Sequence, residues 1–236
     1  MSLHSCRGRQ CAFESLEDRW LLAGNVTAQI VKGNLIIKGD SSDNQIAITA
    51  AAVTGVGTTV NGVAAFTIPS TFAGGIKMNL KGGNDTATLT GPLTLTGLQS
   101  KNTETVTNTG TLTVNGKMDI EGVSTLTLVT TTVNGNMEAE GTRGSDTFLL
   151  TDLKVTGKAE IETGKGTDTV TITGTTAGGA TFGKLAVELG KDNDSLTVNN
   201  TTVTKKTRLD GGRGVDRLVQ TGTNSLAGLK TKHFEA

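Results

Sequence analysis

The sequence contains no tyrosine, a single tryptophan and only two histidines, His4 and His233, which lie close to its two ends. Acid–base and nucleophilic catalysis depend most often on histidine. A catalytic site of the Ser/His/Asp or Cys/His type would therefore have only these two terminal histidines to draw on. Basic and acidic residues balance at 22 each, and no basic run is longer than Lys205 and Lys206. This balance argues against nucleic-acid binding, which needs net positive charge or exposed aromatic side chains.

Long apolar segments and prolines are scarce as well. No stretch is long enough to span a membrane, and no useful window has the 3.6-residue period of an amphipathic helix. The only prolines are Pro69 and Pro92. Strands that are hydrogen-bonded on both sides can spare few backbone donors, so this scarcity is typical of stacked strands. These absences favour an all-β chain.

A turn motif recurs along the chain: a glycine-rich turn ends in an acid, and apolar residues follow two and usually four positions later. Clear copies end at Asp85, Asp146, Asp168, Asp194 and Asp216, and the last three intervals are 22, 26 and 22 residues. A period near 22, with alternating strands on both sides of the turn, predicts a stacked solenoid.

Weaker copies fill the gaps between the clear ones. Glu104 and Asn44 occupy the same slot, and the segment from Ile120 supplies a coil without an acid. The 41 residues from Asn44 to Asp85 would hold two coils, one of them degenerate around residues 60–72. We therefore predict a single-domain, right-handed parallel β-helix (β-solenoid) over residues 24–236, with three short strands per coil and roughly ten coils of about 19–26 residues. Residues 224–236 are expected to cap its C-terminal end.

Strict alternation of apolar and polar residues assigns the two faces of each strand. The predicted inward set includes Val170, Ile172, Val187, Leu196 and Leu218. Their neighbours, predicted to face solvent, are Thr169, Thr171, Glu188, Thr197 and Arg217. Threonine is the commonest residue, with 43 copies, and a β-branched polar side chain suits a solvated pleated surface.

The N-terminal segment, residues 1–23, differs from the rest of the chain. Residues 13–22 resemble the LEPR-XLL signature found near the N-terminus of large bacterial extracellular and surface-associated proteins. Leu16, Glu17, Arg19, Leu21 and Leu22 match that signature, whereas Ser15 and Asp18 depart from its commonest spelling. The resemblance implies export to the surface or the medium and supplies no activity. A short helix that caps the first coil is the alternative, and both can hold.

Both cysteines, Cys6 and Cys11, lie in this same segment. Together with His4 they offer three metal ligands but no fourth, which argues against a structural zinc site. A local disulfide, or two free thiols without a function, is expected instead.

The repeat also resembles the calcium-binding nonapeptide of RTX proteins, GGxGxDxUx. Residues 211–219 match it in full, and residues 164–168 and 144–148 match in part. In that family tandem nine-residue copies enclose Ca²⁺ between successive turns. The copies here are 19 to 26 residues apart, so the calcium cage does not carry over directly. The resemblance implies four weak calcium candidates: Asp146, Asp168, Asp194 and Asp216.

A base stands three residues before most of these acids. The bases are Lys101, Arg143, Lys165, Lys191 and Arg213. Stacked coils would place successive acids ~4.8 Å apart, where like charges repel. We therefore expect the acids to form one row along the rod and the bases to lie beside it and neutralise it without a metal.

A carbohydrate-active enzyme is the natural rival to a structural role, because parallel β-helices include polysaccharide lyases and pectin-type hydrolases. Outward acids on comparable strand faces could form an acidic patch: Asp119, Glu138, Glu140, Glu160, Glu162 and Glu188. Two carboxylates on neighbouring coils would meet the ~5 Å spacing of a retaining glycosidase. Lys117, Lys158 and Lys184 lie beside them, however, which favours a solvated face of mixed charge.

The sequence therefore predicts a non-enzymatic extracellular or cell-surface module with a structural or adhesive role, and no catalytic residue. Expected partners are surface or matrix polymers or other surface proteins, with end-to-end self-association as a further option. The alternatives are a calcium-binding RTX-like solenoid and a carbohydrate-active β-helix enzyme.

Overall fold

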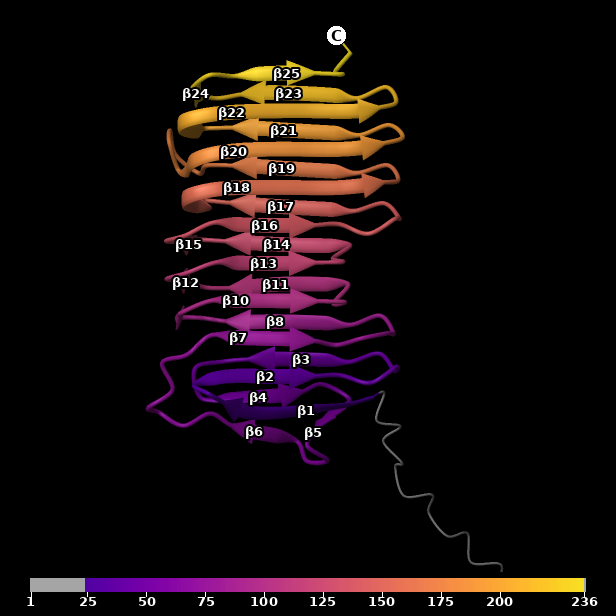
Figure 1. The fold of residues 1–236 in the computed structure, drawn as a ribbon, viewed down its shortest axis with the longest axis vertical. Helices are drawn as coiled ribbons and strands as arrows, with labels where there is room; N and C mark the ends of the chain where they lie inside the picture. Colours follow the sequence, from indigo (N-terminus) through magenta and orange to yellow (C-terminus); the bar gives the residue numbers. More distant parts are fainter. Residues whose placement is uncertain (1–23, 236) are drawn as a thin grey trace, which may run out of the picture.

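The computed structural model describes residues 24–235, and no helix occurs among them. The strands stack into a parallel β-solenoid, whose long axis is vertical in Figure 1. The predicted all-β parallel solenoid is confirmed, whereas its right hand stays a prediction. Within the described range no helix is long and apolar enough to cross a membrane. The N-terminal segment, with its LEPR-XLL-like residues, Cys6 and Cys11, lies outside the described residues.

Two parallel sheets form the body of the rod. One contains β2 (Asn34–Lys38), β7 (Ile76–Asn79), β10 (Leu98–Lys101), β13 (Met118–Glu121), β16 (Met137–Glu140), β18 (Lys154–Lys165), β20 (Ala180–Lys191) and β22 (Thr201–Arg213). The other contains β3 (Gln45–Ile48), β8 (Thr86–Thr90), β11 (Thr105–Thr109), β14 (Thr125–Val129), β17 (Thr147–Thr151), β19 (Thr169–Thr173), β21 (Ser195–Asn199) and β23 (Arg217–Thr221).

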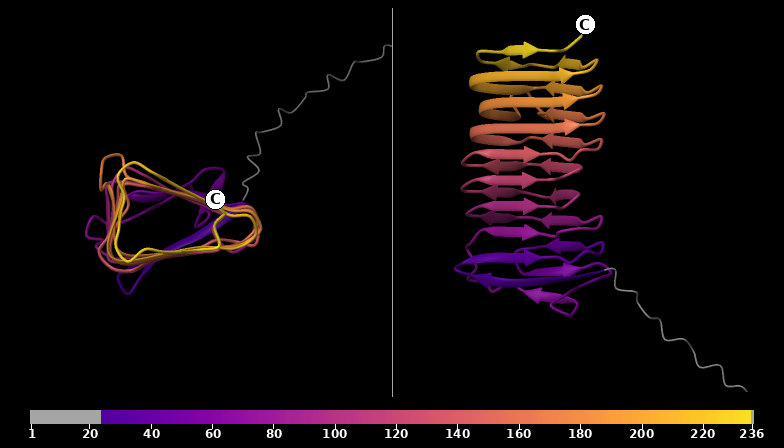
Figure 2. Two further views of the ribbon diagram at one scale, coloured as in Figure 1. Left: turned by 90° about the horizontal axis from the view of Figure 1, so that it is seen from above. Right: turned by 45° about the vertical axis from the view of Figure 1, so that its right-hand side comes forward.

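A third, narrower side closes the cross-section, which is triangular when viewed along the rod (Figure 2). It consists of β9 (Leu93–Leu95), β12 (Leu112–Val114) and β15 (Thr131–Val133), so the middle coils have the predicted three strands. Further along the rod, β18, β20 and β22 each run through the corner as one long strand, with a register shift between its two halves.

The number of coils is lower than the sequence indicated. Eight parallel strands stack from β3 to β23, which makes about seven turns, so the prediction of roughly ten coils is wrong. Gln45 pairs directly with Thr86, and the 41-residue interval is therefore one coil. Its extra residues fold back as the antiparallel strands β4 (Ala52–Gly55) and β6 (Ala65–Thr67). Parallel and antiparallel strands share the same two-residue period, so the pattern alone could not distinguish them.

Antiparallel strands also cover the N-terminal end of the stack (Figure 1). β1 (Gly24–Val31) pairs with β2 through the two-residue turn at Lys32 and Gly33, and β5 (Thr58–Val60) pairs parallel with β1. Both turn residues have positive φ, +48° and +77°, as a type I′ hairpin requires.

At the other end, β24 (Ser225–Leu226) and β25 (Lys230–Lys232) pair parallel with β22 and begin a further coil. The capping role of residues 224–236 stays a prediction.

One continuous apolar core fills the rod. Val170, Ile172 and Leu196 are fully buried, and Val187 is 1% exposed, as predicted. Leu218 also packs on this core but is only partly buried, because β23 is the last strand of its sheet. Each buried side chain of this kind stabilises the fold by roughly 1.5–3 kcal/mol, and stacking makes the stabilisation shared between neighbouring coils.

Candidate functional site

The recurring acids form one row along the rod, as predicted, but their side chains point inward. Asp85, Asp146, Asp168, Asp194 and Asp216 are only 0–3% exposed. The strand alternation explains this direction. Asp168, for example, precedes the core residues Val170 and Ile172 by two and four positions, so all three lie on the inner side.

Three carboxylates in the row, those of Asp168, Asp194 and Asp216, tie their coil to the preceding one. The N–H of Asp146 donates to Oδ1 of Asp168 at 2.8 Å, and the N–H of Asp168 donates to Oδ1 of Asp194 at 2.8 Å. The N–H of Asp194 in turn donates to Oδ1 of Asp216 at 2.9 Å. The acids therefore satisfy backbone donors at the start of each strand, which would be costly to leave unpaired inside the rod.

Two glutamates perform the same task in short coils. Glu104 accepts from the N–H of Asp85, and Glu235 accepts from the N–H of Asp216. Both follow their partner by 19 residues, against 22 or 26 for Asp168, Asp194 and Asp216, so the longer side chain accompanies the shorter coil.

The row is interrupted where the coil from Ile120 supplies no acid. There Ser124 occupies the slot, and its N–H donates directly to the carbonyl of Glu104 at 2.9 Å. Asp146 therefore has no backbone donor from the preceding coil to satisfy. It accepts instead from the N–H and the hydroxyl of Thr142 in its own turn, both at 2.8 Å.

The predicted neutralisation of this row by bases is wrong. Arg143, Lys165, Lys191 and Arg213 are exposed in the turns, and no ion pair between residues 24 and 235 joins them to the buried acids. The bases do form a column of their own, since Lys165, Lys191 and Arg213 are in register. They lie outside the rod while the acids point into it.

Without a cationic partner, Asp85, Asp146, Asp168 and Asp194 hold their protons more tightly than an exposed aspartate does, because their pKa values are raised. Burial raises the pKa of Asp146 and of Asp194 to about 6. Burial likewise raises the pKa of Asp85 and of Asp168 above its ordinary value of 3.8. The backbone N–H groups oppose this effect by stabilising the carboxylate, but desolvation is the larger cause.

The calcium candidates Asp146, Asp168, Asp194 and Asp216 do not fit a calcium cage in this arrangement. Calcium requires six to eight oxygen ligands. Across the described part of the chain, no three His, Cys, Asp or Glu side chains come together in a way that could hold a metal ion. The second oxygen of Asp146 also faces backbone, because a Cβ on Gly141 would lie 2.1 Å from it. Each acid therefore lies apart from the others, and these residues do not fit a calcium site.

A second set of ionisable residues lies on the outer surface of β10, β13, β16, β18, β20 and β22. We call this surface the charged face. One column contains Lys101, Glu121, Glu140, Glu162, Glu188 and Asp210, paired in register from strand to strand. The adjacent column contains Gln99, Asp119, Glu138, Glu160, Ala186 and Arg208. The acidic patch expected from the sequence is therefore present, and register adds Glu121 to it, whereas Asp210 continues the column but is buried.

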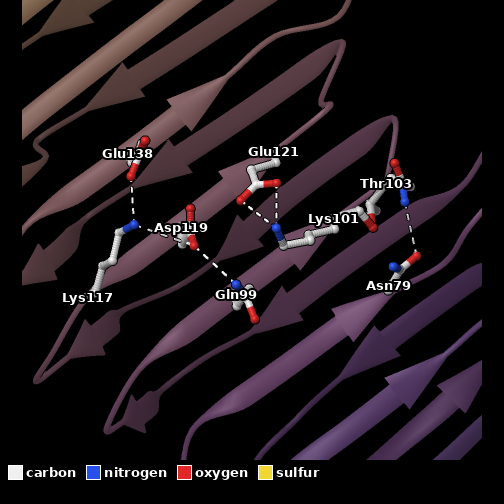
Figure 3. A network of polar contacts seen from close by, with 9 residues as sticks. Asn79, Gln99, Lys101, Thr103, Lys117, Asp119, Glu121 and Glu138 are labelled. Atoms are coloured by element: carbon white, nitrogen blue, oxygen red, sulfur yellow. Dashed lines mark hydrogen bonds and ion pairs between the residues drawn. The ribbon is translucent and has the colours of Figure 1, made fainter.

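Bases beside these columns pair with part of the acids (Figure 3). Lys101 Nζ lies 2.6 Å from Glu121, and Lys117 Nζ lies 2.6 Å from Glu138 and 3.5 Å from Asp119. Such half-exposed pairs add little to stability, typically below about 1 kcal/mol each, but they fix the positions of the side chains. The expected face of mixed charge is confirmed.

The centre of the charged face remains negative. Glu140 and Glu162 lie opposite each other on β16 and β18, and neither forms an ion pair with a described residue. Burial, followed by repulsion from neighbouring carboxylates, raises the pKa of both groups. These two side chains are therefore acids on this face that no described base neutralises.

A depression of about 480 Å³ borders the column near the C-terminal end. Its lining includes carboxylates on one side (Glu162, Glu188 and Asp210), bases on the other (Lys191 and Arg213) and three glycines between them (Gly164, Gly190 and Gly212). His233, which contacts Asp210 at 2.7 Å, closes one end. Gly190 has φ +112°, and a Cβ there would lie 2.1 Å from the carbonyl oxygen of Gly164. The backbone therefore requires glycine at position 190, and the absence of a side chain there leaves the depression open.

Comparison of the chain with protein-family models, with curated proteins and with solved structures finds no match. The functional interpretation therefore rests on the fold and on the residues described above.

Proposed function

We propose that the chain is a non-enzymatic module of the extracellular space or cell surface, with a structural or adhesive role. The observation that carries this proposal is the charged face, on which ionisable side chains repeat in register across six stacked strands. A repeating surface favours a repeating partner, because many weak contacts add up along its length. Surface or matrix polymers and other surface proteins are such partners.

The charges on this face limit the class of partner that it can bind. Unpaired Glu140 and Glu162 at its centre favour polymers that carry amines or other cationic groups. The extracellular location is supported by the resemblance of residues 13–22 to the LEPR-XLL signature of exported bacterial proteins. The match of residues 211–219 to the RTX pattern follows from the glycine-rich turn, which ends in the buried Asp216.

The carbohydrate-active alternative is favoured by one specific observation, the register of Glu140 with Glu162. The same spacing continues to Glu121 on one side and to Glu188 on the other, so the column contains no distinct catalytic pair. We therefore propose binding without turnover.

Binding to immobilised polymers tests this proposal. We expect the full chain to be retained on amine-bearing polysaccharides and to lose retention as salt screens the charges. The double variant E140Q/E162Q should bind more weakly, whereas the matched variant E140D/E162D, which keeps both charges, should bind nearly as the parent does. Equal retention of all three proteins would contradict the assignment of the charged face. Product release from acidic polysaccharides, lost in E140Q/E162Q, would show an enzyme instead.

A further inference from the structure

The sheet formed by β8, β11, β14, β17, β19 and β21 presents a second outer surface, which we call the threonine face. Each strand is five residues long, with positions 1, 3 and 5 directed outward and positions 2 and 4 buried. Six strands with three outward positions each give 18 positions, and threonine occupies 14 of them. The other four are Val129, Leu149, Ser195 and Asn199.

The general β-propensity of threonine does not explain this surface. The charged face belongs to the same coils and has the same strand geometry, yet none of its twelve column positions is threonine and ten are charged. The threonine face, by contrast, contains no charged residue at any of its 18 positions. If threonine served only to solvate a strand, it would be as common in these two columns as it is on the threonine face.

The threonines form a regular two-dimensional array. Thr86, Thr105, Thr125, Thr147 and Thr169 are paired in register from strand to strand and make one column. Successive strands lie ~4.8 Å apart, and outward residues along a strand lie about 6.6 Å apart. In the view along the rod, the coils from magenta to yellow follow nearly the same outline along their sides, so the strands that carry the array form a nearly flat sheet (Figure 2).

The hydroxyl groups of this array are available to a ligand. Thr109 donates to Thr90 at 3.4 Å, and no other hydroxyl of the face bonds a protein group in the described residues. β-Branching restricts χ1, so each threonine holds its methyl and hydroxyl in few orientations. The backbone beneath is hydrogen-bonded on both sides, which makes the surface preorganised for a rigid partner.

We propose that the threonine face binds ice. Oxygen atoms on the prism faces of hexagonal ice repeat along two perpendicular directions, with spacings similar to the two spacings of this array. Threonine offers a hydroxyl that can join a water lattice and a methyl group that gains from being removed from liquid water. An uncharged face suits this partner, because strongly hydrated charges would disturb an ordered layer of water. The many equivalent positions act together, so weak single contacts give firm adsorption.

Thermal hysteresis and partition of the protein into a growing ice crystal test the proposal. The parent chain should lower the freezing point below the melting point in a concentration-dependent way and should be enriched in ice. The double variant T107K/T127K places two charges in the middle column and should lose both effects. The matched control T113K/T132K carries the same pair of substitutions on β12 and β15, on the narrow third side, and should keep them.

Circular dichroism and thermal unfolding must show that all variants remain folded as the parent does. If T107K/T127K unfolds, the smaller changes T107V/T127V and T107S/T127S replace it, and ice adsorption should fall in both. A parent chain without hysteresis or enrichment in ice would overturn the proposal, as would equal loss in T113K/T132K. Retention of the parent on crystalline cellulose or chitin, lost in T107K/T127K without any adsorption to ice, would assign the face to a polysaccharide and also overturn it.

Discussion

Asp194 gives the sharpest test of the buried acid row, because its pKa is raised by burial to about 6 from an ordinary 3.8. A carboxyl group with a raised pKa binds its proton more tightly in the folded chain than in the unfolded chain. Its stabilising contribution is therefore fully present below the unfolded pKa and is lost as the pH rises through the folded pKa. The solenoid should become more stable on mild acidification, unlike proteins whose carboxylates are paired with bases.

The magnitude follows from these two pKa values. Between about pH 7.5 and about pH 5, one such group changes the free energy of unfolding by about 1.4 kcal/mol. Asp146, whose pKa is also about 6, should contribute a similar amount. Asp40, Asp152 and Asp210 have lowered pKa values and act in the opposite sense, but they lose their contribution only at lower pH. The raised groups therefore dominate this window.

Two substitutions separate ionisation from hydrogen bonding. D194N keeps an oxygen to accept the N–H of Asp168 but cannot ionise, so it should remove the share of the acid stabilisation that Asp194 contributes, about 1.4 kcal/mol. D194A removes the acceptor as well and should lower the free energy of unfolding by about 1–3 kcal/mol more, because the buried N–H of Asp168 is left unpaired. Urea unfolding, followed by circular dichroism at the two pH values, measures both effects. A parent chain that is destabilised at the lower pH, or a D194N variant with the full pH dependence, would refute the reasoning.

Further predictions concern the core, the turns and calcium. Ile172→Asp should cost several kcal/mol in urea unfolding, because the fully buried side chain would become an unpaired carboxylate; a cost near zero would contradict the burial. Gly190→Ala should destabilise by about 1–3 kcal/mol, since its φ of +112° and the carbonyl oxygen of Gly164 leave no room for a Cβ, and an unchanged unfolding curve would argue against that backbone. Millimolar Ca²⁺ should change the melting temperature little relative to a chelator, whereas a rise of about ten degrees or more would show a calcium site in the folded state.

The sequence predicted the class of fold because the turn motif and the two-residue alternation both repeat. The alternation also indicates that the acidic side chains point inward, since Asp168 is in phase with the core residues Val170 and Ile172. The bases three positions before the acids conceal this signal, because they favour ion pairs beside the row. The outcome differs because backbone N–H groups of the preceding coil, rather than side-chain bases, stabilise the carboxylates.

Two features could not be predicted from the alternation. The insertion between Asn44 and Asp85 has the composition of a weak coil, and only its pairing shows that it folds back as antiparallel strands. The columns of the charged face depend on register between coils of unequal length. A spacing of 26 residues brings Glu162 opposite Glu188 as accurately as a spacing of 22 brings Glu140 opposite Glu162, because the extra residues lie in a corner loop.

Deletion of whole coils tests most directly the claim that the rod binds through its repeated surface. Removal of residues 147–168 joins Asp146 to Thr169 and takes out one coil in register, and removal of residues 147–194 takes out two. Retention on cells or extracellular matrix should fall with each coil lost, because each coil contributes contacts of its own and the first deletion also removes Glu162. Full loss on removal of one coil would reveal a single discrete site, and unchanged retention of both shortened chains would contradict the proposed role.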